Sequence, residues 1–279
     1  VKIAKLGSGM TVVDFATSLP ELIVSINAAL NNSPAIAINN VIGSNIANIA
    51  LVLSIISILS FIKVDKNFYR QDWPIMFGFS ILLTVFCITD MVLNQFEGAI
   101  LVVSLLFFIY FSLKKSNNKL NIDDIDDKLV STSNTKIILW LLISSVSLYF
   151  GAEFLVNGAV NFAKQINISE AVISVSIVAI GTSIPELAAS LIAIAKKEKG
   201  ISVGNLIGSN IFNIGSVLGI TAIIKPIQIA QEIIERDIIW MLFFALLLLF
   251  MVILPRRNDL GKLKGFFMLL LYFVFITLA

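Results

Sequence analysis

The segment TSLPELIVSINAAL at residues 17–30 recurs as TSIPELAASLIAIA at residues 182–195. A second segment, NVIGSNIANI at residues 40–49, recurs as NLIGSNIFNI at residues 205–214. Position 17 thus corresponds to position 182, and position 40 to position 205. The members of both pairs are separated by the same number of residues, and we call this number the repeat offset. One match of this kind can arise by chance, but two matches in register indicate an internal duplication.

The composition indicates whether the chain is surrounded by water or by a lipid bilayer. Of its 279 residues, 58% are hydrophobic and 14% are charged, and the mean hydropathy is +0.96. A soluble domain of this size would have too little polar surface to face water. Many apolar runs approach or exceed the roughly 20 residues that a helix needs to cross a bilayer. The sequence therefore predicts an all-α, polytopic membrane protein that has the lipid bilayer as a partner.

Nine apolar runs are predicted as membrane-spanning helices. They cover residues 9–30, 35–62, 73–93, 97–113, 136–163, 168–195, 201–224, 237–254 and 263–279. Five spans separate equivalent points of the repeat, and because five is odd, the two halves are expected to have opposite orientations. Secondary transporters with such an inverted repeat place a site at the midplane. A helix equivalent to 136–163 is expected ahead of Val1, so we predict that the first span is absent from this sequence.

One long polar interval, residues 114–135, separates a first half, residues 1–113, from a second half, residues 136–279. Its acidic patch lacks the ligand spacing and the glycine of an EF-hand, which favours a solvated linker over a regulatory cation-binding loop. If this linker faces the cytoplasm, 17 of the 20 Lys and Arg residues lie on the cytoplasmic side. The other three are Lys164, Lys225 and Arg236. This bias follows the positive-inside rule and supports a cytoplasmic linker.

The composition also excludes several classes of protein. The chain has no histidine and a single cysteine, Cys87, which removes the usual ligands of zinc, copper and nickel and any disulfide framework. A net charge of +2 without a basic stripe argues against a nucleic-acid partner. Without histidine, hydrolytic machinery is hard to assemble, so we expect neither an enzyme nor a bound cofactor.

The first motif places a proline in the middle of an apolar helix in each half. Pro20 and Pro185 have no N–H and clash with the carbonyl group four residues earlier. Helical hydrogen bonding is therefore expected to fail around Thr17 and Thr182. Carbonyl groups that are freed at membrane depth must be satisfied, and a cation can satisfy them.

The same motif adds one carboxylate to each half, on Glu21 and Glu186. No Lys or Arg lies in a nearby span, which argues against a buried structural ion pair, the alternative role for these residues. Two carboxylates balance one divalent ion. The hydroxyl groups of Ser18 and Ser183 lie within a turn, and a set of hard oxygens suits Ca²⁺ better than a soft metal.

The second motif supplies a serine and an asparagine four residues apart, which places both on one face of a helix. These residues are Ser44 and Asn48 in the first half and Ser209 and Asn213 in the second. Hydrogen bonding between helices is the alternative role for them. Gly43 and Gly208 are expected to permit close helix approach.

These duplicated motifs resemble the two alpha-repeats of the cation/calcium exchanger superfamily, most closely those of prokaryotic sodium/calcium exchangers. The resemblance covers nearly the whole chain in order and topology. It implies ten helices in two inverted groups of five, of which nine are present here, with broken helices around the ion site. It also implies a multi-pass protein of the cell membrane, in a prokaryote the cytoplasmic membrane, and makes no prediction of oligomeric state.

The resemblance implies a role for each motif residue. Glu21 and Glu186 would bind both Ca²⁺ and Na⁺, and the remaining ligands would supply backbone, hydroxyl or amide oxygens. These are Thr17, Ser18, Thr182, Ser183, Ser44, Asn48, Ser209 and Asn213. Potassium-dependent relatives carry an aspartate at the position of Asn213, so potassium dependence is disfavoured.

The first half departs from the family pattern at four positions. Ala16 replaces a glycine and Asp14 replaces an apolar residue, while Asn39 and Ala47 stand where the second half has Gly204 and Phe212. Asp14, Ser18 and Glu21 are spaced four and three residues apart and share a helix face. Asp14 is therefore expected either to lie near the mouth of the site, as a bystander, or to modulate it as a third carboxylate through which protons compete with the ion.

The leading hypothesis is a Na⁺/Ca²⁺ antiporter that works by alternating access. A Ca²⁺/H⁺ exchanger is the alternative within transport. A cation channel would be expected to have a continuous charged ring instead of broken helices. A degenerate, non-transporting membrane protein is the remaining alternative, because of the departures in the first half.

Overall fold

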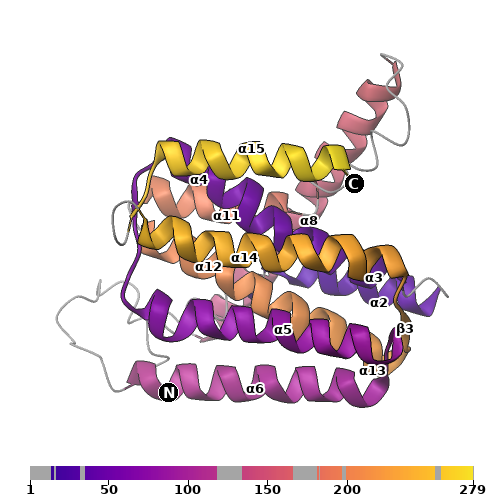
Figure 1. Ribbon diagram of the computed structural model, residues 1–279. Helices are drawn as coiled ribbons and strands as arrows, with labels where there is room; N and C mark the ends of the chain where they lie inside the picture. Colours follow the sequence, from indigo (N-terminus) through magenta and orange to yellow (C-terminus); the bar gives the residue numbers. More distant parts are fainter. Residues whose placement is uncertain are drawn as a thin grey trace.

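The computed structural model describes residues 14–15, 17–31, 35–117, 134–165, 181, 183–196, 199–254 and 259–278. In these ranges the chain is almost entirely helical (Figure 1). The first half contains α2 (Leu19–Leu30), α3 (Ala35–Ala47), the π-helix η1 (Asn48–Val52), α4 (Leu53–Leu59), β1 (Ile62–Lys63), the π-helix η2 (Phe68–Asp72), α5 (Trp73–Asp90), β2 (Val92–Leu93) and α6 (Gln95–Asn117). The second contains α8 (Asn134–Gln165), α11 (Ile184–Ala195), α12 (Lys199–Phe212), η5 (Asn213–Leu218), α13 (Gly219–Ile224), β3 (Ile227–Gln228), η6 (Ile233–Asp237), α14 (Ile238–Ile253), β4 (Asp259–Leu260) and α15 (Lys262–Leu278).

The repeat in the sequence is also a repeat in the structure. Shifting α2 by the repeat offset gives α11 with the same ends, and the same shift places the start of η1 on that of η5. It also carries η2 onto η6 and β1 onto β3. The internal duplication is therefore confirmed in these elements, including the π turns, which are rare in proteins and concentrate at functional sites.

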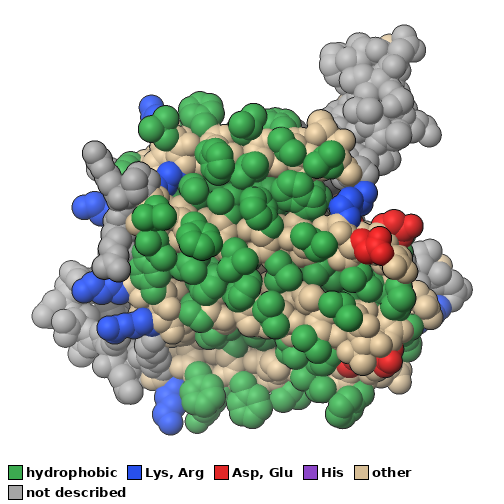
Figure 2. Space-filling model, viewed as in Figure 1, with side chains coloured by type: hydrophobic (Ala, Val, Ile, Leu, Met, Phe, Trp, Pro, Cys, Tyr) green, Lys and Arg blue, Asp and Glu red, His purple; other side chains and the backbone are tan. Residues whose placement is uncertain are grey.

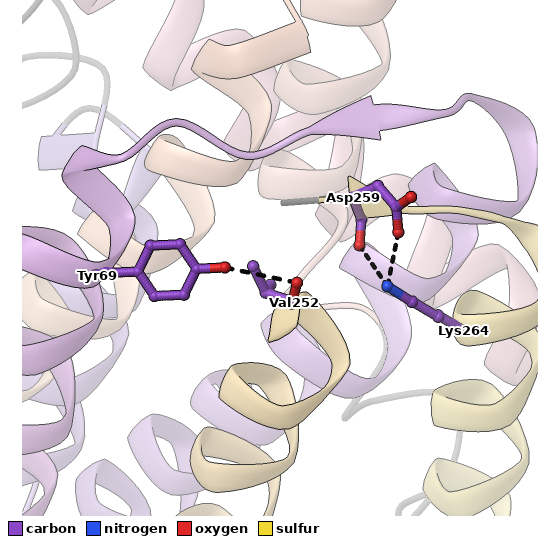
Figure 3. A network of polar contacts seen from close by, with 4 residues as sticks. All are labelled: Tyr69, Val252, Asp259 and Lys264. Carbon is purple, nitrogen blue, oxygen red and sulfur yellow. Dashed lines mark hydrogen bonds and ion pairs between the residues drawn. The ribbon is translucent and has the colours of Figure 1, made fainter. Parts of the chain in front are cut away.

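The two halves are joined by short antiparallel strand pairs. β1 of the first half pairs with β4 of the second, and β2 pairs with β3. Because β1 and β2 precede and follow α5, the two pairs lie at opposite ends of that helix. Near the β1–β4 pair, the hydroxyl group of Tyr69 donates to the carbonyl of Val252 at 3.5 Å, which adds a second link between the halves (Figure 3).

The outer surface is that of a protein surrounded by lipid. Five of the described helical segments are long and apolar enough to cross a membrane, α2 and α11 are shorter apolar helices, and large hydrophobic side chains such as Phe96 and Leu263 are 75% and 86% exposed. In Figure 2, hydrophobic side chains cover the middle of the visible face, and Lys and Arg side chains lie mainly along its left edge. The prediction of a polytopic membrane protein is confirmed.

Two central spans form the core of the described structure. Of the residues in the apolar stretches of Ile36–Leu59 and Val203–Ile224, 83% are buried, against 28% for Phe68–Asp90 and for Gln95–Lys114. Glycines let the outer helices approach them closely: a Cβ on Gly98 of α6 would lie 2.7 Å from the carbonyl oxygen of Gly219. A Cβ on Gly265 of α15 would lie 2.7 Å from the carbonyl oxygen of Ser54 in α4. The duplicated motifs therefore lie on or next to the two most enclosed segments.

Candidate functional site

Both copies of the first motif interrupt a helix directly ahead of the proline. α2 begins at Leu19 and α11 at Ile184, and Pro20 and Pro185 lie in their first turns, where a missing N–H costs no helical hydrogen bond. The residue ahead of each helix, Ser18 or Ser183, occupies the N-cap position, and its side chain makes no capping hydrogen bond. The two helices therefore start at equivalent positions in the two halves. The predicted failure of helical hydrogen bonding is incomplete around Thr17, because the Ser18 N–H still donates to the Asp14 carbonyl at 3.0 Å. Thr182 lies outside the described residues.

Glu21 and Glu186 lie in the first turns that follow these breaks. Their side chains are 2% and 1% exposed, and within the described part of the chain none of their four carboxylate oxygens has a hydrogen-bond partner. The two carboxylates also interact electrostatically with each other. Each lies near the positive end of a helix dipole, which favours negative charge but only partly offsets the loss of water. The pair therefore has unused capacity to bind cations.

The hydroxyl groups around the glutamates divide into two kinds. Thr17 Oγ1 lies 3.1 Å from Ser209 Oγ, a contact that joins the first motif of one half to the second motif of the other, and it donates to the Asp14 carbonyl at 3.2 Å. The Oγ atoms of Ser18 and Ser183 are buried and have no partner among the described residues, so they remain available as ligands. Ser44 is also buried, and Thr182 lies outside the described residues.

Four asparagines form a reciprocal network across the two halves. Asn45 Nδ2 donates to the Asn210 carbonyl at 3.3 Å, and Asn210 Nδ2 donates to the Asn45 carbonyl at 3.2 Å. Asn48 Nδ2 donates to Asn210 Oδ1 at 2.9 Å, and Asn213 Nδ2 donates to Asn45 Oδ1 at 3.2 Å. The amide nitrogens of Asn48 and Asn213 are thus occupied. Their buried Oδ1 atoms have no partner in the described ranges and remain free to accept a cation.

Residues of the repeated motifs in the two halves thus contact one another and leave buried oxygens without a partner in the described ranges. The model for the sodium/calcium exchanger protein family matches residues 1–114 and 136–279. The chain belongs to the sodium/calcium exchanger family. The resemblance expected from the motifs is confirmed, and the family consists of transporters and not of enzymes.

Several members of this family are similar over nearly the whole chain. CaxA of Alkalimonas amylolytica, described as an antiporter, is 34% identical over 95% of this chain and 84% of its own length. The sodium/calcium exchanger MaX1 of Methanosarcina acetivorans is 27% identical over 96% of this chain and 87% of its own. A structure of the sodium-calcium exchanger NCX_Mj soaked with 10 mM Na⁺ and 10 mM Sr²⁺ superposes with a TM-score of 0.78, at 30% identity, over 99% of this chain and 87% of the other.

Two further residue pairs in this exchanger were missed by reasoning from the sequence. Ser25 and Ser190 lie one turn beyond the glutamates, fully buried, and their hydroxyl groups have no partner in the described residues. Asn40 and Asn205 likewise have side-chain amide nitrogens that are buried without a described partner. The repeat offset, which relates the members of both pairs, is the signal that could have found them.

One expectation about the second motif needs correction. Gly43 and Gly208 were expected to permit close helix approach, but a Cβ on Gly43 would meet no described atom within 4 Å. A Cβ on Gly208 would overlap the side-chain carboxylate of Asp14. Gly208 therefore makes room for a side chain of the other half, whereas Gly43 has no such contact among the described residues.

Proposed function

We propose that the chain exchanges Ca²⁺ for Na⁺ across the membrane by alternating access, with both ions competing for the oxygens between Glu21 and Glu186. The observation that carries this proposal is the pair of buried carboxylates whose four oxygens have no partner in the described residues. Leaving two carboxylates in this condition is costly unless a cation compensates them. One Ca²⁺ neutralises both charges.

The surrounding donors support a hard cation. Within the described residues, no group of three acidic, cysteine or histidine side chains converges on a point, so two carboxylates supply the charge and neutral oxygens complete the shell. Ser18, Ser183 and the Oδ1 atoms of Asn48 and Asn213 supply such oxygens. Ca²⁺ takes six to eight oxygen ligands, and Na⁺ has a similar size and preference. Ion competition for one set of oxygens follows from this chemistry.

The counter-ion is tested by calcium uptake into proteoliposomes. We expect uptake when an outward Na⁺ gradient is imposed at equal pH on both sides, and no uptake with a pH gradient in the absence of Na⁺. Uptake driven only by the pH gradient would assign the counter-ion role to H⁺, since the same carboxylates can bind protons. A folded protein that takes up calcium under neither gradient would contradict antiport.

We propose that the chain lies in a prokaryotic cytoplasmic membrane with its β1–β4 end facing the cytoplasm. The excess of Lys and Arg assigned to that side supports this orientation. Lys66 follows β1 and Ala230 follows β3, at the opposite end, and both side chains are exposed. In a Cys87→Ala background, we expect an impermeant thiol reagent added to intact cells to label Ala230→Cys and to spare Lys66→Cys. The reverse pattern would overturn the orientation.

A further inference from the structure

Asp14 carries a third buried carboxylate at the interface of the two halves. Its side chain is 3% exposed, and its Oδ1 atom is buried without a hydrogen-bond partner among the residues that the structure describes. The carboxylate packs against Gly208, so closely that any Cβ at that position would overlap it. Asp14 belongs to the first half and Gly208 to the second, so the contact crosses the interface.

This feature breaks the symmetry of the repeat. The repeat offset relates Asp14 to Ala179, which has no charge, and relates Gly43 to Gly208. A Cβ on Gly43 would meet no described atom within 4 Å. Glycine is therefore required sterically at Gly208, where the carboxylate lies, and is not required by any described contact at Gly43.

Asp14 lies close to the candidate site without being part of its ligand set. One turn along its chain, Thr17 Oγ1 lies 3.1 Å from Ser209 Oγ, next to Gly208. The Asp14 carboxylate lies within electrostatic range of Glu186, as that of Glu21 does. However, no three acidic side chains converge on one point in the described ranges. Asp14 can therefore act on a bound cation through space and not as a third direct ligand.

We propose that Asp14 is a specificity-determining residue that favours divalent over monovalent cations at the site between Glu21 and Glu186. The proposal rests on the proposed function. A Coulomb interaction scales with the charge of the ion, so a fixed carboxylate stabilises a divalent cation twice as strongly, in free energy, as a monovalent cation at the same point. Removing the carboxylate lowers the affinity for each ion by some factor. The factor for Ca²⁺ is therefore expected to be the square of the factor for Na⁺.

The first experiment removes the charge and keeps the shape. In Asp14→Asn, we expect the affinity for Na⁺ to fall roughly tenfold per ion and that for Ca²⁺ to fall roughly a hundredfold. Both are measured by calorimetric titration of the purified protein with each ion alone. Equal changes for the two ions, or no change for either, would overturn the proposal.

The second experiment keeps the charge and displaces it. Gly208→Ala forces the Asp14 carboxylate to move, so we expect a loss of preference for Ca²⁺ over Na⁺. Gly43→Ala is the matched control and should keep the preference of the parent. In an Asp14→Ala background, Gly208→Ala should add no further loss. An equal effect of Gly208→Ala in both backgrounds would show that it acts on helix packing, and would contradict the proposal.

The failure of this inference is distinguishable from a failure of the proposed function. If the parent protein does not bind Ca²⁺, or binds it and does not exchange it for Na⁺, the proposed function fails first. If the parent exchanges both ions and Asp14→Asn keeps the same selectivity ratio, only the role of Asp14 is rejected.

Discussion

In the described residues, the helices that follow the two prolines start and end at equivalent positions in the two halves, whereas α6 and α15, the last helix of each half, start differently. α2 and α11 are both 12 residues long, and their first residues, Leu19 and Ile184, are related by the repeat offset. In contrast, α6 begins with a capping box, in which the Asn94 N–H donates to Glu97 Oε2 at 2.9 Å and the Glu97 N–H donates to Asn94 Oδ1 at 3.0 Å. α15 begins after Gly261, and Lys264 Nζ reaches back to Asp259 Oδ1 at 2.6 Å and to its carbonyl at 2.8 Å (Figure 3).

This difference separates two kinds of constraint. The first N–H groups of a helix need acceptors, and the capping box supplies them to α6. At the start of α15, Lys264 instead ties the first turn to the preceding strand through Asp259. The duplicated residues of the centre keep identical spacing, as the proposed ion site requires, because that site takes oxygens from both halves. Asp14 is a difference between the halves within this centre, and its proposed effect is on the ion selectivity of the site.

The largest expected effect comes from removing either central carboxylate. Glu21→Gln and Glu186→Gln should each abolish calcium uptake in proteoliposomes, because one remaining carboxylate cannot neutralise a divalent ion at these buried positions of low dielectric. Both variants should fold, since a neutral amide is less costly to bury than an unpaired carboxylate.

Glu97→Gln is the matched control for these variants. Glu97 is also a buried carboxylate in a membrane-spanning helix, but it accepts a hydrogen bond in the capping box that glutamine can also accept. Calcium uptake should remain in this control. Near-normal uptake by either Glu21→Gln or Glu186→Gln would break the equivalence of the two halves and remove that residue from the site.

An intermediate effect is expected from the asparagine network. Asn45→Ala removes the acceptor of the Asn213 amide, and Asn210→Ala removes that of the Asn48 amide. Each variant should weaken the apparent affinity for Ca²⁺ by roughly tenfold, the cost of a misplaced or unsatisfied buried amide. The concentration dependence of uptake measures it. A loss in one variant and none in the other would show that only one half positions its ligand in this way.

The smallest effect is expected at the start of the outer helices. Asn94→Ala removes a helix cap and should lower the free energy of unfolding by about 1 kcal/mol. Lys264→Ala breaks an ion pair whose side chains are 10% and 15% exposed, together with a hydrogen bond to the Asp259 carbonyl, and should cost about 1–3 kcal/mol. Thermal unfolding in detergent measures both, and calcium uptake at a temperature well below unfolding should be unchanged. A large loss of uptake in either variant would show that these helix ends contribute to transport.

Much of this molecule could be predicted from its sequence because each motif occurs twice, so that one copy supports the interpretation of the other. The two copies of the motif around Pro20 and Pro185 predicted broken helices, and α2 and α11 begin where those prolines require. The apolar runs predicted the spans, and a described helix overlaps each of the nine. The roles of the ten motif residues as ion ligands stay predictions until the substitutions are made.

Other features depend on contacts between residues far apart in the chain. Asn45 and Asn210 were visible as repeated residues, but their function lies in hydrogen bonds across 162 to 168 positions, which no local pattern encodes. The contact between Asp14 and Gly208 likewise joins the halves. The paired strands β1 and β4 are only two residues long, too short to give a period-2 pattern.

The π-helices η1 and η5 have a consequence for deletions of a single residue. A π turn holds one residue more than an α turn, and the two segments start at Asn48 and Asn213, the asparagines predicted to bind the ion. Removing one of residues 49–52 would let η1 close into a regular α-helix, while α3 and α4 keep the faces that they now present. Removing a residue from the middle of α3 would instead turn the motif by about 100° relative to the preceding part of that helix. At each of these two bulges the chain can therefore lose a residue without rotating the α-helix that follows relative to the one that precedes it.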